Sequence, residues 1–172
     1  MNTLKLGSLV IPLRAGLDIE QTYTLIGGET TLRTLDGTGI KQETWRKLRT
    51  TITGSGWLPA GISALDTTAS MAVACITPQG IVADASRQAT LPAARRSDAG
   101  HAPWAWALLP HGELANTPMT LVGNIATADA YAGAEGYLIQ YYPQPTCWVQ
   151  RPLESGNRAD ATYRWEITAE EV

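Results

Sequence analysis

The sequence of 172 residues has no phenylalanine, two cysteines, two histidines and few charges. Charged residues make up 17% of the chain, below the usual quarter, and the net charge is -3. Nucleic-acid binding requires a concentrated basic face, so this balance argues against a nucleic-acid partner. No uncharged apolar run approaches the 18 residues of a membrane-spanning helix, so no membrane association is expected.

The two cysteines, Cys75 and Cys147, both lie in apolar, strand-like runs and form no metal-binding or redox spacing motif. Isolated cysteines of this kind are usually buried thiols. We therefore predict that both are buried and reduced, as in a protein made in a reducing cytoplasm.

Turn-forming and amphipathic residues are plentiful: 16 glycines, 10 prolines, six tryptophans and six tyrosines. Segments with period-2 alternation, such as residues 163–168, are separated by glycine and proline turns, which is typical of β structure. We predict about ten strands in an all-β fold, either a β-sandwich or a partly open β-barrel, with long loops and little helix. At this length the sequence predicts a single β domain over residues 1–172.

Residues 44–66 are the stretch around which the chain is organised. They begin as a β-branched strand, and Gly54 and Gly56 are predicted to break it and act as a hinge. Trp57 and Pro59 are predicted to restart the chain as an anchor in the core; the other interpretation of Trp57 is an exposed contact residue. Upstream, Gly27-Gly28 gives a hairpin signal, and residues 36–39 give another turn.

Residues 86–103 form an irregular excursion that is too long to serve only as a connection between strands in a compact domain. The pair Arg95 and Arg96 lies within it, either contacting an acidic partner or as part of a solvated loop. We predict that this excursion contributes to subunit contact, ordered in the assembly and mobile in the dissociated protein.

Trp104 and Trp106 alternate with alanines, which places both indoles on one face of a strand. They are predicted to pack in the core or at a subunit contact. The other interpretation is a sugar-stacking platform, because flat aromatic rings suit sugar rings.

Signals for catalysis are weak. His101 and His111 lie in loops without metal-ligand spacing, and the chain has no Gly-x-Ser-x-Gly nucleophile motif. The glycine pairs Gly37/Gly39 and Gly54/Gly56 lack the strand-to-helix setting of a phosphate loop. We therefore expect no enzymatic activity, no catalytic residue, no cofactor and no bound metal.

Three segments carry a family resemblance: the Leu-rich N-terminal strand with Ile11-Pro12, the passage from Thr44-Trp45-Arg46-Lys47 to Gly54-x-Gly56-Trp57-Leu58-Pro59, and the closing Tyr163-Arg164-Trp165-Glu166-Ile167. Over the first third and last tenth of the chain, the sequence resembles tail-tip proteins of long-tailed bacteriophages. The similarity is greatest to distal-tail and related minor tail proteins, which build rings between tail tube and baseplate.

This resemblance implies a β-sandwich or tube-like β fold, a ring oligomer, no catalysis, and a place in the virion tail after assembly in the host cytoplasm. The expected partners are further copies of the chain and other tail or baseplate proteins. The sequence departs from the family in lacking a clear second domain for host carbohydrate. The alternative hypothesis, from another class, is a carbohydrate-binding β-sandwich that takes a host-surface saccharide on Trp104, Trp106 or the strand at residues 137–142.

Overall fold

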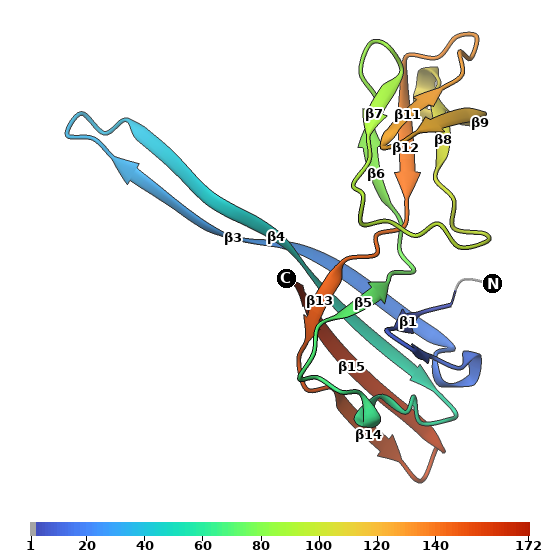
Figure 1. Ribbon diagram of the computed structural model, residues 1–172. Helices are drawn as coiled ribbons and strands as arrows, with labels where there is room; N and C mark the ends of the chain where they lie inside the picture. Colours follow the sequence, from blue (N-terminus) through green and yellow to red (C-terminus); the bar gives the residue numbers. More distant parts are fainter. Residues whose placement is uncertain (1–2) are drawn as a thin grey trace. The chain divides into compact units, whose positions relative to one another are not determined.

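The computed structural model describes residues 3–172, and over this range 55% of the chain is strand and 5% helical. The helical part consists of short 3-10 turns, and the described strands form three antiparallel sheets without a closed barrel (Figure 1). The prediction of an all-β fold with little helix is therefore confirmed, and the arrangement is consistent with a sandwich. The 3-10 turns are η1 (Leu13–Ala15), η2 (Ile62–Ala64) and η3 (Pro110–Gly112).

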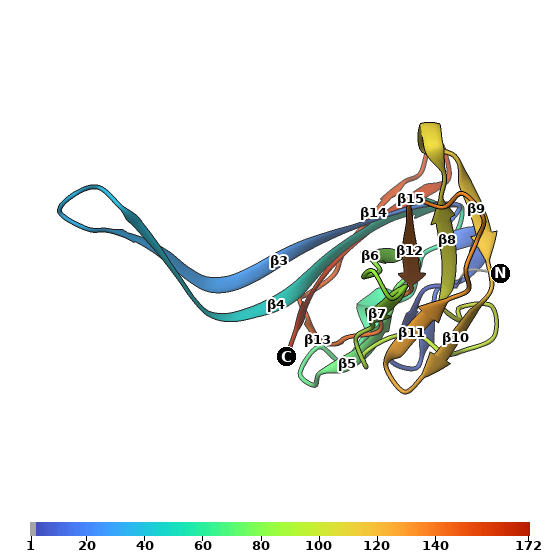
Figure 2. The same cartoon turned by 90° about the horizontal axis from the view of Figure 1, so that it is seen from above.

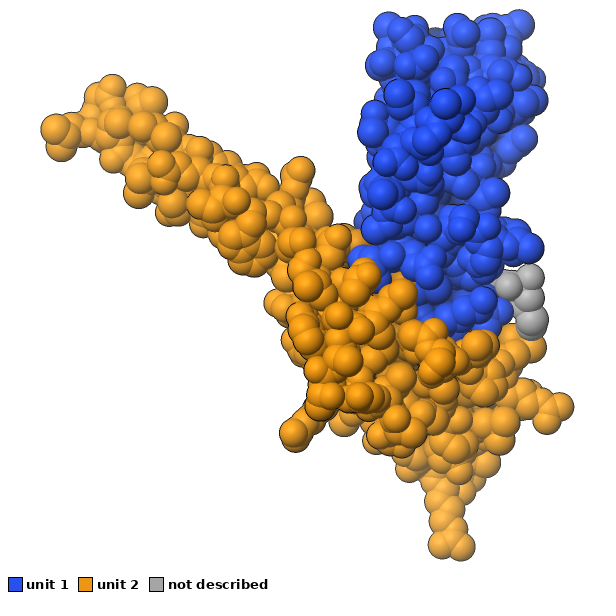
Figure 3. Space-filling view, in the orientation of Figure 1, with its two compact units in different colours: residues 1–5, 74–145 blue, residues 6–73, 146–172 orange. Residues whose placement is uncertain are grey.

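The chain divides into two compact units, whereas the sequence predicted one domain. Unit 1 comprises residues 1–5 and 74–145, and unit 2 comprises residues 6–73 and 146–172 (Figure 3). Two of the three crossings between the units, at residues 5–6 and 73–74, lie within strands, and the third is the short Pro-Gln-Pro-Thr segment at residues 143–146, so no long polar or glycine-rich linker marks the division.

An eight-stranded sheet forms the body of unit 2, in the order β2-β1-β5-β13-β15-β4-β3, with β14 paired to β15. The last strand in sequence, β15, is central: it pairs with β13, β14 and β4. The strand bounds are β1 (Lys5–Leu6), β2 (Leu9–Val10), β3 (Asp18–Arg33), β4 (Gly39–Gly56), β5 (Met71–Ala74), β13 (Thr146–Val149), β14 (Leu153–Asn157) and β15 (Thr162–Glu171).

The core of unit 2 follows the alternation of its strands. In β15, Trp165 and Ile167 are buried, whereas the neighbouring Glu166 is exposed. Ile52 of β4 lies directly opposite Ile167 and is also buried. The period-2 pattern predicted for this segment is thus the pattern of the structure, with one face packed and the other solvated.

Unit 1 contains the two smaller sheets, ordered β10-β11-β7 and β6-β12-β8-β9. Their shared core is rich in alanine, which β7, β8 and β11 all contribute, and β12 adds the larger Tyr137, Ile139 and Tyr141. The alanines come from both sheets, and together with the large side chains of β12 they fill the space between the two sheets. The bounds are β6 (Gln79–Val82), β7 (Gln88–Thr90), β8 (Trp104–Leu108), β9 (Leu114–Thr117), β10 (Met119–Val122), β11 (Ile125–Ala128) and β12 (Gly136–Tyr141).

The paired strands β3 and β4 continue beyond the sheet of unit 2 as a curved, two-stranded ribbon (Figures 1 and 2). The β4–β15 pairing stops at Arg49, so residues 25–48, here called the arm, pair only with each other. The predicted turn at Gly27-Gly28 is wrong: these glycines lie inside β3, where the β3–β4 register shifts. The turn instead follows Arg33, because Asp36-Gly37 supplies the better turn sequence.

Candidate functional site

Gly54 and Gly56 do not break the strand as predicted, because β4 runs through both of them and Gly56 pairs with Tyr163. Their importance is instead steric. A Cβ at Gly54 would lie within 2.9 Å of a ring carbon of Trp165 and nearer still to two others. A Cβ at Gly56 would overlap the backbone of Arg14 and Ala15. Both glycines are therefore sites of close approach, with extended backbone that other residues also adopt.

The predicted core anchor is also wrong, since the Trp57 side chain is 64% exposed and Pro59 is exposed. The Trp57 amide donates to Arg14 O (2.8 Å), which fixes the backbone there and leaves the indole outside. The buried aromatic residue of this region is Trp165, whose Nε1–H donates to Ala15 O (2.7 Å). The apolar pattern of the sequence indicated a buried tryptophan in this region, but it did not distinguish Trp165 from Trp57.

The Trp57→Ala variant is expected to change the free energy of unfolding by no more than about 0.5 kcal/mol, as for most exposed positions. The matched control is Trp165→Ala, which removes a buried aromatic side chain and should cost about 3–5 kcal/mol. Chemical denaturation of the two variants gives both values. A large loss in Trp57→Ala would contradict the exposed position of this indole.

Arg96 was predicted either to contact an acidic partner or to lie in a solvated loop, and the structure contradicts both because Arg96 is only 1% exposed. Its Nε and Nη2 donate to the two carboxylate oxygens of Asp98 at 2.9 and 2.7 Å. Its Nη1 donates to the carbonyl oxygens of Cys75 (2.9 Å) and Thr3 (3.2 Å). A buried guanidinium with a bidentate carboxylate and two carbonyls is a structural centre of unit 1.

The neighbouring Arg95 is half-buried and also bound within its own unit. It donates to Pro92 O (2.6 Å), Gly123 O (2.8 Å) and Asn124 Oδ1 (2.8 Å). The segment at residues 86–103, predicted as an irregular excursion, also contains the strand β7. Hydrogen bonds of Arg95 and Arg96 thus hold the irregular part of this segment in place. The mobility of the segment in the dissociated protein stays a prediction.

His101 packs beside this arginine centre, with its Nδ1 3.0 Å from Oδ2 of Asp98. The hydrogen bonds from Arg96 hold the pKa of Asp98 well below its usual range. Burial, together with the positive charge of Arg96, lowers the pKa of His101. The group therefore holds a carboxylate, a guanidinium and a neutral imidazole at pH 7.

Trp104 and Trp106 are both half-buried and lie on the outer face of the four-stranded sheet of unit 1. The alternating residues Ala105 and Ala107 point into the core. Trp106 Nε1–H donates to Gln140 Oε1 (2.8 Å), and the Trp104 ring lies 5.4 Å from that of Tyr142. The prediction of a core position is wrong, because the strand turns its small residues inward. The partner-contact and sugar-stacking interpretations remain predictions.

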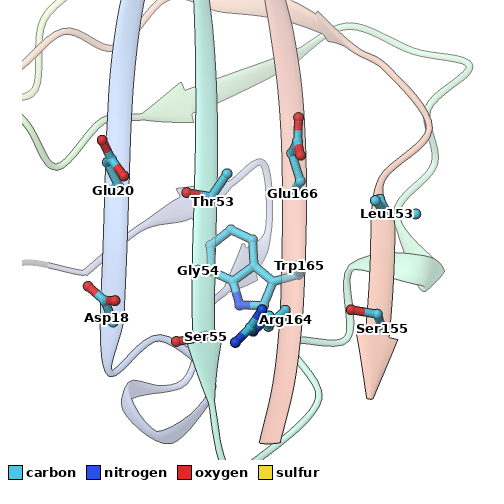
Figure 4. A pocket seen from close by; sticks show the side chains of 10 residues that line it. All are labelled: Asp18, Glu20, Thr53, Gly54, Ser55, Leu153, Ser155, Arg164, Trp165 and Glu166. Atoms are coloured by element: carbon cyan, nitrogen blue, oxygen red, sulfur yellow. The ribbon is translucent and has the colours of Figure 1, made fainter. Parts of the chain in front are cut away.

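A depression of about 430 Å³ on unit 2 lies across the four strands β3, β4, β15 and β14 (Figure 4). Two rows of side chains cross it, and Trp165 is visible at its floor because Gly54 has no side chain. The described lining has hydroxyl groups but no histidine that could activate them as a general base, and no cysteine nucleophile. The lining residues are Asp18, Glu20, Thr53, Gly54, Ser55, Leu153, Ser155, Arg164, Trp165 and Glu166.

Other candidate chemistry is equally limited within residues 3–172. No group of three or more His, Cys, Asp or Glu in this range is placed to hold a metal ion. The described part of the chain has no helix long and apolar enough to cross a membrane. Cys75 and Cys147 are both fully buried thiols, which confirms their predicted burial.

The surface that the sequence did not predict is the arm. It exposes five large apolar side chains on a ribbon that nothing else in unit 2 covers: Leu25, Leu32, Leu35, Ile40 and Trp45. The base of the arm is fixed, because the Leu48 amide donates to the Glu171 carboxylate (2.9 Å) and Arg49 pairs with Glu170 (2.7 Å). The sequence predicted strand structure within the arm, but with a turn at Gly27-Gly28 that the structure does not have, and it did not show that a third strand is missing beside the arm.

Comparison of the sequence and the structure with protein-family models, curated proteins and solved structures gives no match.

Proposed function

We propose that this protein is a structural subunit of a bacteriophage virion tail, in a tail-tip or baseplate ring between the tail tube and the distal parts, and that it acts by oligomeric assembly. The observation that carries the proposal is the arm, residues 25–48, with its exposed apolar side chains. The resemblance of three sequence segments to tail-tip proteins supplies the setting. The partners are further copies of the chain and other tail proteins assembled in the host cytoplasm.

A two-stranded ribbon is marginally stable in water unless it packs against something else. Both backbone edges of the arm beyond Arg49 lack a paired strand within the described chain, and such open edges favour pairing with another chain. Exposed apolar side chains on the same ribbon favour burial in a contact. Each feature is a cost for a monomer and an advantage for a subunit.

The purified protein is expected to form rings, with a mass several times the 18.5 kDa of the chain. Light scattering after size exclusion gives the mass, and negative-stain electron microscopy shows the shape. The matched variant replaces residues 28–45 with an Asn-Gly turn, which joins strands already paired at Gly27 and Arg46. It should keep the fold and become monomeric.

A chain that stays monomeric at all concentrations would contradict the proposed assembly. The place in the virion has its own test: an antibody against the chain should label the tail end of the phage particles that encode it. Labelling of the capsid, or of no particle, would contradict the tail assignment even if rings form.

The second candidate function is saccharide binding, and the position of Trp104 and Trp106 favours it. Both indoles are partly accessible on an outer sheet face, and Gln140 and Asn116 lie on neighbouring strands opposite them, on the same face. Stacking rings beside amide groups suit a neutral sugar. A monomer whose tryptophan fluorescence is quenched by saccharide would support this candidate over the tail subunit.

A further inference from the structure

The loop at the end of the arm is held by its own hydrogen bonds. The Thr34 amide donates to Thr38 O (3.0 Å), and the Thr38 amide donates to Asp36 Oδ1 (3.1 Å). The Thr34 hydroxyl also donates to the Asp36 carboxylate. Leu35 is thereby fixed at the apex of the loop, where it is the most exposed large apolar side chain of residues 3–172.

Two further aliphatic side chains extend this apolar surface. Leu32 and Ile40 lie directly opposite each other in the β3–β4 register, and each is about half exposed. We call Leu32, Leu35 and Ile40 the arm tip. Removing apolar area of this kind from water is favourable at about 25 cal/mol per Å², so an apolar acceptor of matching size would bind it.

Such an acceptor lies at the opposite end of β4. A hollow of about 230 Å³ lies beside strands β14 and β15, next to Pro59 and Ala60. It is here called the β14–β15 hollow. It is smaller than the roughly 300–1,000 Å³ of small-molecule sites and suits an aliphatic side chain. The exposed Trp57 and Leu58 precede it in the chain. The lining consists of Pro59, Ala60, Glu154, Ser155, Gly156, Tyr163, Arg164 and Trp165.

The charges on the two surfaces are complementary. Arg33 and Asp36 flank Leu35 in the arm, and both are exposed. Glu154 lines the β14–β15 hollow on the same sheet face as Trp165 and is exposed as well. Arg33 of the arm tip can therefore pair with Glu154 beside the hollow when the two surfaces meet.

We infer that the arm tip of one copy docks in the β14–β15 hollow of a second copy, which rests on the self-assembly in the proposed function. The 18 residues of β4 span roughly 55 Å at ~3.3 Å per residue, so a tip cannot reach the hollow of its own chain. The two surfaces differ, so the contact is head-to-tail. Contacts of this type close into rings or continue as filaments, whereas a contact between identical surfaces stops at a dimer.

Disulfide trapping tests this contact on the full-length chain. A Leu35→Cys protein is mixed with a Glu154→Cys protein under mild oxidation; both positions are exposed, and the native Cys75 and Cys147 are fully buried. Docked thiols experience a millimolar effective concentration, so cross-linking should be roughly a thousandfold faster than between micromolar chains that only collide. The matched control replaces Glu154→Cys with Val10→Cys, an exposed position on β2.

The inference predicts a dominant Leu35→Cys/Glu154→Cys heterodimer, and a ladder of multimers from the doubly substituted chain. Equal cross-linking with Val10→Cys, or preferred linkage between two Leu35→Cys chains, overturns the docking site. If rings form without the predicted cross-link, this contact is wrong and the proposed function stands. A protein that neither cross-links nor assembles, or whose arm tip binds lipid vesicles instead, overturns both.

Discussion

The Gly54→Val variant is expected to lose about 3 kcal/mol of unfolding free energy, at the upper end of the usual cost of overpacking, because its side chain must occupy space now filled by the Trp165 indole. Displacing the indole also breaks its buried hydrogen bond to Ala15 O, worth about 1 kcal/mol. Neither β4 nor β15 can shift alone, since they pair in continuous register from Arg49 to Gly56. Chemical denaturation measures the loss.

Gly39→Val is the matched control, because it puts the same change on the same strand at its other end. There a Cβ meets only a methyl group of Thr31, at an ordinary 3.8 Å, so the loss should be small. A second test adds Trp165→Leu, which vacates part of the indole space. Gly54→Val should cost much less in that background, and equal costs in both backgrounds would show that the steric explanation is wrong.

The second large effect is expected from Asp98→Asn, which removes the charge partner of buried Arg96 while keeping its shape. Breaking a buried ion pair costs roughly 3–5 kcal/mol, and the value here should be near 3 because the Asp98 side chain is 39% exposed. Asp18→Asn, at an exposed position of unit 2, is the control and should change little. An Asp98→Asn variant as stable as the parent would contradict the assignment of a structural ion pair.

The same group makes stability depend on pH. Asp98 has a pKa lowered chiefly by the hydrogen bonds from Arg96, so its contribution is present above about pH 4 and is lost as the pH falls below that value. His101 has a pKa lowered chiefly by burial, so its contribution is present above about pH 6.5 and declines as the pH falls. The parent should therefore lose stability in two steps on acidification. In the Asp98→Asn variant the step below about pH 4 should shrink.

Alternation in the sequence predicted much of the sheet structure, because successive side chains of a strand point to opposite faces. A strand with one packed face therefore has an apolar residue at every second position. Residues 163–167 are the clearest example: Trp165 and Ile167 point inward, as the pattern required. The same logic could not assign Trp57, since an exposed tryptophan after a strand has the same local sequence as a buried one. Only the pairing of β4 with β15 shows that Trp165 fills the space over Gly54.

The local sequence pattern could not predict features that depend on residues far away in the sequence. The carbonyl groups that receive the Arg96 guanidinium belong to Thr3 and Cys75, far away in sequence, so its burial had no local signal. The arm could not be predicted because its distinguishing feature is a neighbouring strand that is absent. Both its strands have β-forming sequences, and no property of residues 25–48 indicates that a third strand is missing.

The division of the chain between the units has a consequence for vectorial synthesis. Unit 1 is nearly continuous in sequence, so residues 74–145 can fold as they leave the ribosome, whereas unit 2 must wait for residues 146–172. Its last strand, β15, is the central one of the sheet, placed between β13 and β4. The arm is a local hairpin and is complete in sequence long before then. A chain that stops within residues 146–172 therefore has an arm attached to an open sheet, and only a chain that includes β15 presents the arm on a finished sheet.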